Sequence, residues 1–207
     1  MITNANKYIS SLNQGLRNAQ FKIKSKTLSL DSFFFELIAK TKDLKSENGR
    51  IFFFGNGASD AFSHHMALDW SKNGGIPSVS LSSTSFLTAL ANDINYESAF
   101  LEFLKLQKPR SSDLVVTTSS SGNSSNIVNL LEFCSDNQLQ TFGLSGLENN
   151  NQTVKLATFS AFIDMKTYGM VECIHQILHH LWLDLYMGVY EWEKNEPQNM
   201  DINNFKL

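Results

Sequence analysis

Two predicted helices carry histidine and carboxylate side chains at spacings that suit metal or acid–base chemistry. In the segment SHHMALDW, His65 and Asp69 stand four residues apart, so a helix places them on one face, one turn apart. His64 points to another face, and we expect it to pack or to support the site from outside. The last long helix adds Glu172 and His180. These two helices therefore offer a set of four groups that suits tetrahedral zinc or general acid–base catalysis.

The helix expected over residues 170–187 has one broad apolar face and one polar face. The polar face has no lysine or arginine, whereas solvent-exposed faces usually mix charges of both signs. We therefore expect this face to line a site, although a single histidine there is more often a hydrogen-bonded structural residue. The apolar face comprises Val171, Ile174, Ile177, Leu178, Leu181, Trp182 and Leu185, and the polar face comprises Glu172, His175, Gln176, His179 and His180.

Two turns rich in glycine or serine follow predicted strands. The first, GNGAS, contains Gly55, Gly57 and Ser59; the second, TTSSSGNSSN, surrounds Gly122 with serines. A helix N-terminus offers unpaired N–H groups and the positive end of the helix dipole, which suits a phosphate. Either turn alone is also typical of a flexible, serine-capped loop. Because both stand at equivalent positions and neither fits a dinucleotide or P-loop pattern, we expect the phosphate of a small sugar.

Predicted strands and helices alternate along the chain, and these elements must position the groups described above. Short apolar runs alternate with helical segments from residue 51 onward, which favours a parallel sheet with helices on both faces. In such sheets, ligands bind at the carboxyl ends of the strands. The expected strands cover residues 50–55, 76–82, 113–119, 139–146 and 157–164, and crossover helices are expected in SHHMALDWSKNG, SFLTALANDINYESAFLEFLKLQ and SNIVNLLEFCSDNQ.

The two ends of the chain differ from this alternating region. Residues 1–48 contain two amphipathic stretches, and the second, after Ser29, places Phe33, Phe34 and Leu37 on one helix face. We expect an N-terminal helical extension over 1–48, a single α/β domain over 49–190, and a polar, loosely ordered C-terminal tail over 191–207.

Composition limits the classes of function. The 207-residue chain has 42% hydrophobic and 18% charged residues, which is typical of a soluble globular domain, and no apolar run is long enough for a membrane span. Its net charge of −3 and lack of a basic stripe argue against nucleic-acid binding. The N-terminus lacks the pattern of a secretory signal, and Cys134 and Cys173 are expected to be reduced and buried. We therefore expect a cytoplasmic protein.

The segments FGNGASDAFSHHMALDW, LANDINY and TTSSSGNSSNIV, together with the helix that carries Glu172, His175 and His180, resemble the sugar isomerase (SIS) domain. Within that family they are most similar to phosphoheptose isomerases, and the resemblance covers most of the chain. It implies an α/β, flavodoxin-like fold with a five-stranded parallel sheet flanked by helices. It also implies a homotetramer built through the helices, active sites at subunit junctions, and one zinc ion per subunit.

The resemblance further implies an aldose–ketose isomerase that converts sedoheptulose 7-phosphate to D-glycero-D-manno-heptose 7-phosphate through an enediol. This reaction supplies heptose for bacterial surface polysaccharides such as lipopolysaccharide and capsule. By the same resemblance, Asp69 and His180 are the acid–base pair, and His65, Asp69, Glu172 and His180 are the metal ligands. The implied substrate-binding residues are Asn56, Gly57, Ala58, Ser59, Asp69, Asn92, Asp93, Ser119, Ser120, Ser121, Ser124 and Glu172.

Three positions depart clearly from the family's pattern, and Ala58, in place of a glycine after Gly57, is a milder change. Asp69 replaces a glutamate, Glu172 replaces a glutamine, and Gly169 stands where an aspartate is expected. These changes leave two alternatives open: an isomerase of a different phosphosugar, and a non-catalytic SIS module that binds a sugar phosphate or serves in assembly. The non-catalytic module would need the serine turn but not the acid–base groups, so His65, Asp69 and His180 favour an enzyme.

Overall fold

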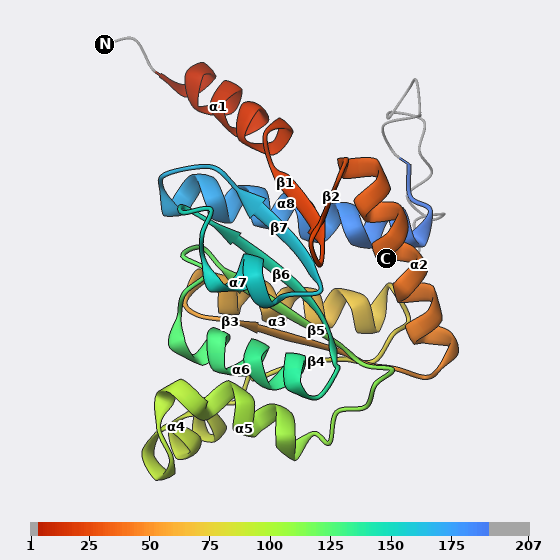
Figure 1. The fold of residues 1–207 in the computed structure, drawn as a ribbon, viewed down its shortest axis with the longest axis vertical. Coiled ribbons are helices and arrows are strands. Elements are labelled where there is room, and N and C mark those ends of the chain that lie inside the picture. The colour runs from red at the N-terminus through yellow and green to blue at the C-terminus, as the bar shows by residue number, and fades with distance from the viewer. Residues whose placement is uncertain (1–3, 191–207) are drawn as a thin grey trace.

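The computed structural model describes residues 4–190, which form a single sheet with helices on both of its faces (Figure 1). The strand order is β2-β1-β7-β6-β5-β3-β4. The strands are β1 (Gln20–Ile23), β2 (Lys26–Leu28), β3 (Ile51–Gly55), β4 (Ser78–Ser80), β5 (Leu114–Ser119), β6 (Gln140–Gly146) and β7 (Phe159–Ile163).

The five predicted strands are all present and form the parallel part of the sheet, from β4 through β3, β5 and β6 to β7. The expected total of five was wrong, because the N-terminal region adds the antiparallel hairpin β1-β2 at one edge. Lys24, with a φ of 54°, turns the hairpin, and Phe21 pairs with Ala161 of β7. The region 1–48 is thus not only helical. The prediction for the tail concerns residues outside the described part of the chain.

The helices largely follow the apolar periodicity. Ser29 caps α2 as expected, by accepting a hydrogen bond from the backbone of Ser32. The single helix predicted in residues 85–107 is instead interrupted at Ile94 and continues as η1 and α5, and the short α7 was not predicted. The helices are α1 (Ala5–Arg17), α2 (Leu30–Ser46), α3 (Ala58–Lys72), α4 (Thr84–Asp93), η1 (Tyr96–Ser98, 3-10), α5 (Ala99–Leu106), α6 (Ser125–Asp136), α7 (Gln152–Leu156) and α8 (Tyr168–Met187).

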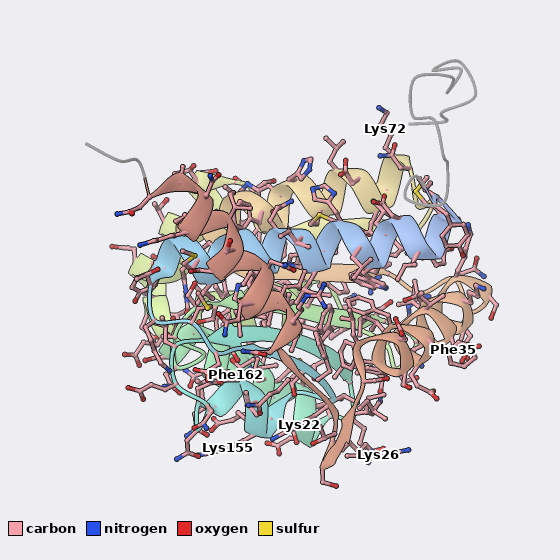
Figure 2. The ribbon with its side chains drawn as sticks, turned by 90° about the horizontal axis from the view of Figure 1, so that it is seen from above. Lys22, Lys26, Phe35, Lys72, Lys155 and Phe162 are labelled. Carbon is pink, nitrogen blue, oxygen red and sulfur yellow. The ribbon has the colours of Figure 1, made fainter. Side chains whose placement is uncertain are left out.

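Two apolar cores lie on opposite faces of the sheet. One is covered by α2, α3 and α8, and its centre is a ring contact between Trp70 and Trp182 with centroids 4.3 Å apart. The other is covered by α4, α5, α6 and α7. Figure 2 shows α1 lying across α8 and Phe35 pointing outward from α2, where it is 72% exposed. Phe33 and Phe34, which share the predicted helix face, are buried, whereas Phe35 is not.

The register of the sheet decides where the two unusual turns lie. β3 and β5 are neighbouring parallel strands, with Gly55 opposite Thr118 at their carboxyl ends. The turns that follow them must therefore lie side by side.

At the opposite end of the strands, the fully buried Asp113 carboxylate binds the Arg50 guanidinium at 2.8 Å. No helix in the region 4–190 is long and apolar enough to cross a membrane.

Candidate active site

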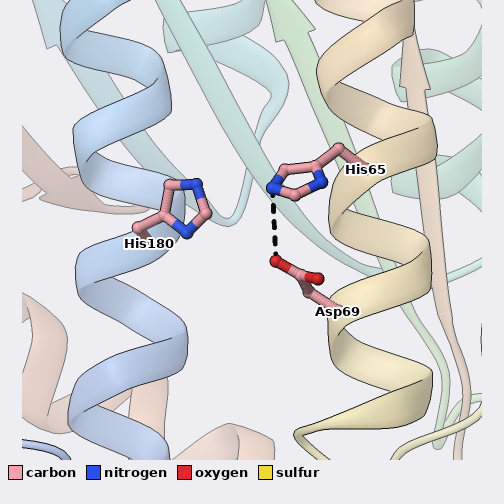
Figure 3. Close-up of side chains that lie close together, drawn as sticks. All are labelled: His65, Asp69 and His180. Carbon is pink, nitrogen blue, oxygen red and sulfur yellow. Dashed lines mark ion pairs between the residues drawn. The ribbon is translucent and has the colours of Figure 1, made fainter. Parts of the chain in front are cut away.

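Three of the predicted groups converge between α3 and α8 (Figure 3). Potential ligand atoms of His65, Asp69 and His180 all lie within 4.8 Å of one another. The His65 Nε2 is 3.3 Å from the Asp69 Oδ2, and the His65 and His180 ring centroids are 5.3 Å apart. The Asp69 side chain is 17% exposed, whereas His65 is 48% exposed, so the cluster is open to a small molecule from one side.

Local helix geometry and core packing together place this cluster. α3 buries Ser63, Met66 and Trp70, which fixes its rotation against the sheet. His65 and Asp69 then share the face that looks toward α8, as their spacing predicts. On α8, the buried Trp182 and its neighbour Leu178 orient the helix so that His180 reaches across to the α3 pair.

Gln176, predicted only to lie on the polar face of α8, is a neighbour of His180. Its side-chain Nε2 lies 2.7 Å from the Nε2 of His180. Because an amide nitrogen donates but does not accept, the imidazole nitrogen is the acceptor in this contact. The spacing of four residues on one helix was the signal that could have identified this pair.

Glu172 is not among the three groups that the structure brings together. It lies eight residues before His180 on α8, which corresponds to about 12 Å along the helix axis. Its carboxylate therefore does not join the three clustered groups in this structure. The assignment of Glu172 as a metal ligand and substrate-binding residue stays a prediction.

The expectation that the whole polar face of α8 lines a site was wrong for two histidines. His175 and His179 are fully buried, and Ile177, expected on the apolar face, is 42% exposed. His175 Nε2 lies 3.2 Å from the Ser145 carbonyl oxygen, and His179 Nε2 lies 2.9 Å from the Thr118 hydroxyl. Burial lowers the pKa of His175 to about 4 and that of His179 to about 3, so both rings are neutral. They are structural residues because α8 packs against both the sheet and α3.

The serine turn lies at the carboxyl end of β5 and leads into α6. Gly122 adopts a φ of +65°, and its N–H donates to the Ser119 hydroxyl at 3.2 Å. The Ser119 and Ser124 hydroxyl oxygens are 3.4 Å apart. The Ser120 hydroxyl is buried without a hydrogen-bond partner among the described residues, and the Ser124 side chain does not cap α6. The turn thus combines hydroxyls with a helix N-terminus that its N-cap side chain does not cap.

The glycine turn occupies the neighbouring position after β3. Gly57 has a φ of +59° and a ψ of −121°, and an added Cβ would meet open space. Ala58 is exposed, and Ser59 is 4% exposed in the first turn of α3. Asn56 extends from the end of β3 toward the serine turn, where it meets the side chain of Asn126. This contact joins the two turns.

Two other predicted substrate residues lie at the C-terminal end of α4. Asn92 and Asp93 are exposed, and the Asn92 amide donates to the Asp93 carboxylate at 2.9 Å. His64, expected outside the site, lies 3.2 Å from Asp60 and 3.4 Å from the Leu81 carbonyl oxygen. The α3 histidines thus belong to two separate pairs.

Comparisons with known proteins agree with this architecture. A model of the SIS domain matches residues 36–146. The chain is 28% identical over 152 residues to a phosphoheptose isomerase of Aneurinibacillus thermoaerophilus, which covers 70% of this chain and 76% of the relative. It is 31% identical over 143 residues to a probable phosphoheptose isomerase of Thermoplasma volcanium, which covers 66% of this chain and 71% of the relative.

Solved structures of similar fold include a phosphoheptose isomerase from Neisseria gonorrhoeae, with a TM-score of 0.75 and 20% identity. That match covers 90% of this chain and 96% of the other. A phosphoheptose isomerase from Francisella tularensis matches with a TM-score of 0.70 and 18% identity, over 89% of this chain and 97% of the other. At these identities, the structural matches establish the fold.

Proposed function

This chain belongs to the SIS domain family, and we propose that it is an aldose–ketose isomerase that converts sedoheptulose 7-phosphate to D-glycero-D-manno-heptose 7-phosphate. The observation that carries the proposal is the convergence of His65, Asp69 and His180 between α3 and α8. A module that only bound a sugar phosphate would need the serine turn but no such cluster. The similarity to phosphoheptose isomerases selects the seven-carbon substrate.

The reaction requires a proton to leave the carbon beside the carbonyl and another to move between the two oxygens, through an enediol. Asp69 is the base, because its carboxylate is largely shielded from solvent yet reaches the open cluster. His180 is its acid–base partner, since its imidazole lies in the same cluster and can both accept and donate a proton. Aspartate is one methylene shorter than the family's glutamate, so the sugar must approach α3 more closely.

The donor set fits a zinc ion. Two imidazoles and one carboxylate within 4.8 Å of one another match the three protein ligands of many catalytic zinc sites, which keep the fourth position open. A bound zinc ion would polarise the sugar's carbonyl group. The residues that would hold it are His65, Asp69 and His180, and Glu172 stays a predicted fourth ligand.

The serine turn binds the phosphate in this proposal. The N-terminus of α6, which its N-cap side chain does not cap, and the Ser120 hydroxyl, which has no partner within residues 4–190, supply donors without a charged side chain. The hydroxyls of Ser119, Ser121 and Ser124 add to them. The neighbouring glycine turn then lies beside the sugar, with Asn56, Gly57 and Ala58 facing it. Asn92 and Asp93 would border the sugar from the end of α4.

The proposal includes a homotetramer, and the apolar surface beside the cluster supports contact with another copy of the chain. A shallow cavity of about 590 Å³ lies along α8 and is lined by Phe62, Ile177, Leu181 and the catalytic His180. Leu68 on α3 is 59% exposed. Exposed apolar side chains that surround a site favour coverage by protein. In this proposal the covering protein is a second copy of the chain, so that the active sites lie at subunit junctions. The proposed enzyme works in the cytoplasm, where it supplies heptose for surface polysaccharides.

The test compares two histidine variants on a panel of ketose phosphates, with product followed by NMR. His180→Ala should lower kcat/KM for sedoheptulose 7-phosphate by about 100-fold or more, as loss of an acid–base group does. His64→Ala is the matched control, because His64 pairs with Asp60 outside the cluster, and it should stay within about threefold of the wild type. Retained activity in folded His180→Ala would overturn the assignment.

The same panel separates the two alternatives. Turnover of another ketose phosphate in preference to the seven-carbon sugar would identify a different phosphosugar isomerase. Binding without turnover of any sugar would identify a non-catalytic module. Metal analysis of wild type and His65→Ala tests the zinc proposal, which requires about one zinc ion per subunit in the wild type and a clear loss in the variant.

A further inference from the structure

Three residues from distant parts of the chain form a hydrogen-bonded group between the two turns. The Asn56 and Asn126 amides exchange two hydrogen bonds of 2.9 Å, one in each direction. The Tyr96 hydroxyl donates to the Asn56 Oδ1 at 2.7 Å. Asn56 directly follows β3, Asn126 lies in the first turn of α6, and Tyr96 begins η1. The group thus connects the glycine turn, the serine turn and the segment that follows α4.

Counting donors and acceptors shows what this group leaves for a ligand. The Asn56 oxygen has two lone pairs, and Asn126 and Tyr96 occupy both. The Asn56 nitrogen has two hydrogens, of which Asn126 takes one. One N–H of a half-buried Asn56 therefore remains, in an amide whose orientation is fixed by two partners.

The surroundings hold both partners in place. Asn126 is 2% exposed in the first turn of α6, so its side chain has little freedom. Tyr96 belongs to η1, and the Asn129 amide ties this segment to α6 by donating to the Glu97 carbonyl oxygen at 3.0 Å. The break in the helix after α4 is what brings Tyr96 over Asn56.

We propose that Asn126 and Tyr96 are positioning residues that fix the Asn56 amide and the spacing between the phosphate-binding turn and the sugar-binding turn. The inference rests on the proposed function, because it assigns the two turns to the two ends of one substrate. A phosphate held on α6 and a sugar held beside β3 must keep a constant separation if the reacting carbon is to meet Asp69. Small misplacements of that kind can cost about 100-fold in rate.

The kinetic test uses Asn126→Ala and Tyr96→Phe. Asn126→Ala should lower kcat for the sugar phosphate by about 10- to 100-fold, and Tyr96→Phe by about 3- to 10-fold, because the second change removes only one of the bonds to Asn56. Competitive inhibition by inorganic phosphate should stay within about twofold in both, since the serine turn is intact. Asn137→Ala is the matched control: this asparagine lies just beyond the opposite end of α6, where it donates to the Phe133 carbonyl oxygen, and the change should leave kcat unaltered.

A double-mutant cycle separates positioning from a general loss of stability. If Asn126 acts through Asn56, the double variant Asn56→Ala/Asn126→Ala should be no slower than Asn56→Ala alone, within about twofold. The positioning role would be overturned if the losses in kcat of the two single variants multiplied in the double variant. It would also be overturned if Asn126→Ala weakened inhibition by inorganic phosphate as much as it lowered kcat. Tyr96 is half exposed, so Tyr96→Phe should fold. If Asn126→Ala does not fold, Tyr96→Phe still tests the proposal.

Failure of the proposed function gives a different result. If the wild type turns over no sugar phosphate, calorimetry decides the positioning role instead. Asn126→Ala must then weaken binding of sedoheptulose 7-phosphate while leaving that of inorganic phosphate unchanged. Equal affinities for the sugar phosphate in wild type and variant, or no binding by either, would overturn it.

Discussion

Gly122→Ala should be among the most damaging single-methyl additions in the described part of this protein. Gly122 has a φ of +65°, a left-handed conformation that costs an L-residue about 1–2 kcal/mol. An added Cβ would also overlap the side chain of Asn151, which is fully buried. Asn151 therefore has to move.

The cost of moving Asn151 can be estimated from its hydrogen bonds. Its oxygen accepts from the backbone of Val154 and caps α7, and its nitrogen donates to the Ser145 hydroxyl and the Glu148 carbonyl oxygen. Each bond contributes about 1 kcal/mol, so loss of two or three of them together with the left-handed penalty gives about 3–5 kcal/mol.

The assay is urea unfolding and thermal unfolding at one protein concentration. Gly188→Ala is the matched control, because Gly188 is also left-handed, with a φ of 73°, but its nearest neighbour would be 4.0 Å away. At about 2–4 °C per kcal/mol for a chain of this length, Gly122→Ala should lower Tm by about 6–20 °C. Gly188→Ala, which carries only the left-handed penalty of about 1–2 kcal/mol, should lower it by about 2–8 °C. Equal shifts in the two variants would refute the role of Asn151.

Two further predictions concern buried polar groups on the α8 side of the sheet. Thr41→Val should lower the free energy of unfolding by about 1–3 kcal/mol, because it leaves the buried Trp182 Nε1 without its acceptor at 3.0 Å. Thr41→Ser keeps the hydroxyl and should cost less. Equal losses in the two variants, measured by urea unfolding, would contradict this prediction. Burial holds the pKa of His175 at about 4. As the pH falls from about 6.5 to 4, the unfolded chain therefore takes up a proton that the folded chain does not. The free energy of unfolding falls over that interval by up to about 3 kcal/mol. His175→Gln should remove about one proton from the difference in proton uptake between the unfolded and folded chains. The check is the slope of unfolding free energy against pH, measured by urea unfolding between pH 7 and pH 4.5, and an unchanged slope would contradict the prediction.

The elements that local sequence specifies were predictable. All five parallel strands were predicted because each is a short apolar run between turn residues. The pairing of His65 with Asp69 follows from helix geometry, since residues four apart share a face whatever the helix packs against. The serine turn was recognisable because its residue types favour a turn and a helix start.

The remaining features depend on how the elements pack together. The hairpin β1-β2 is short, and pairing with β7 stabilises it. Residues 85–107 satisfy helical periodicity, yet the chain turns at Ile94, and this places Tyr96 beside Asn56. Neither contact has a signal in the local sequence.

The sequence alone determined that α8 carries histidines, and the tertiary structure decided what each one does. Helical spacing assigned His175, His179 and His180 to one polar face. Packing against both the sheet and α3 buries the first two and leaves His180 facing His65. The physical reason is that spacing along a helix fixes only the relative directions of side chains, whereas the neighbouring elements fix which direction is core and which is site.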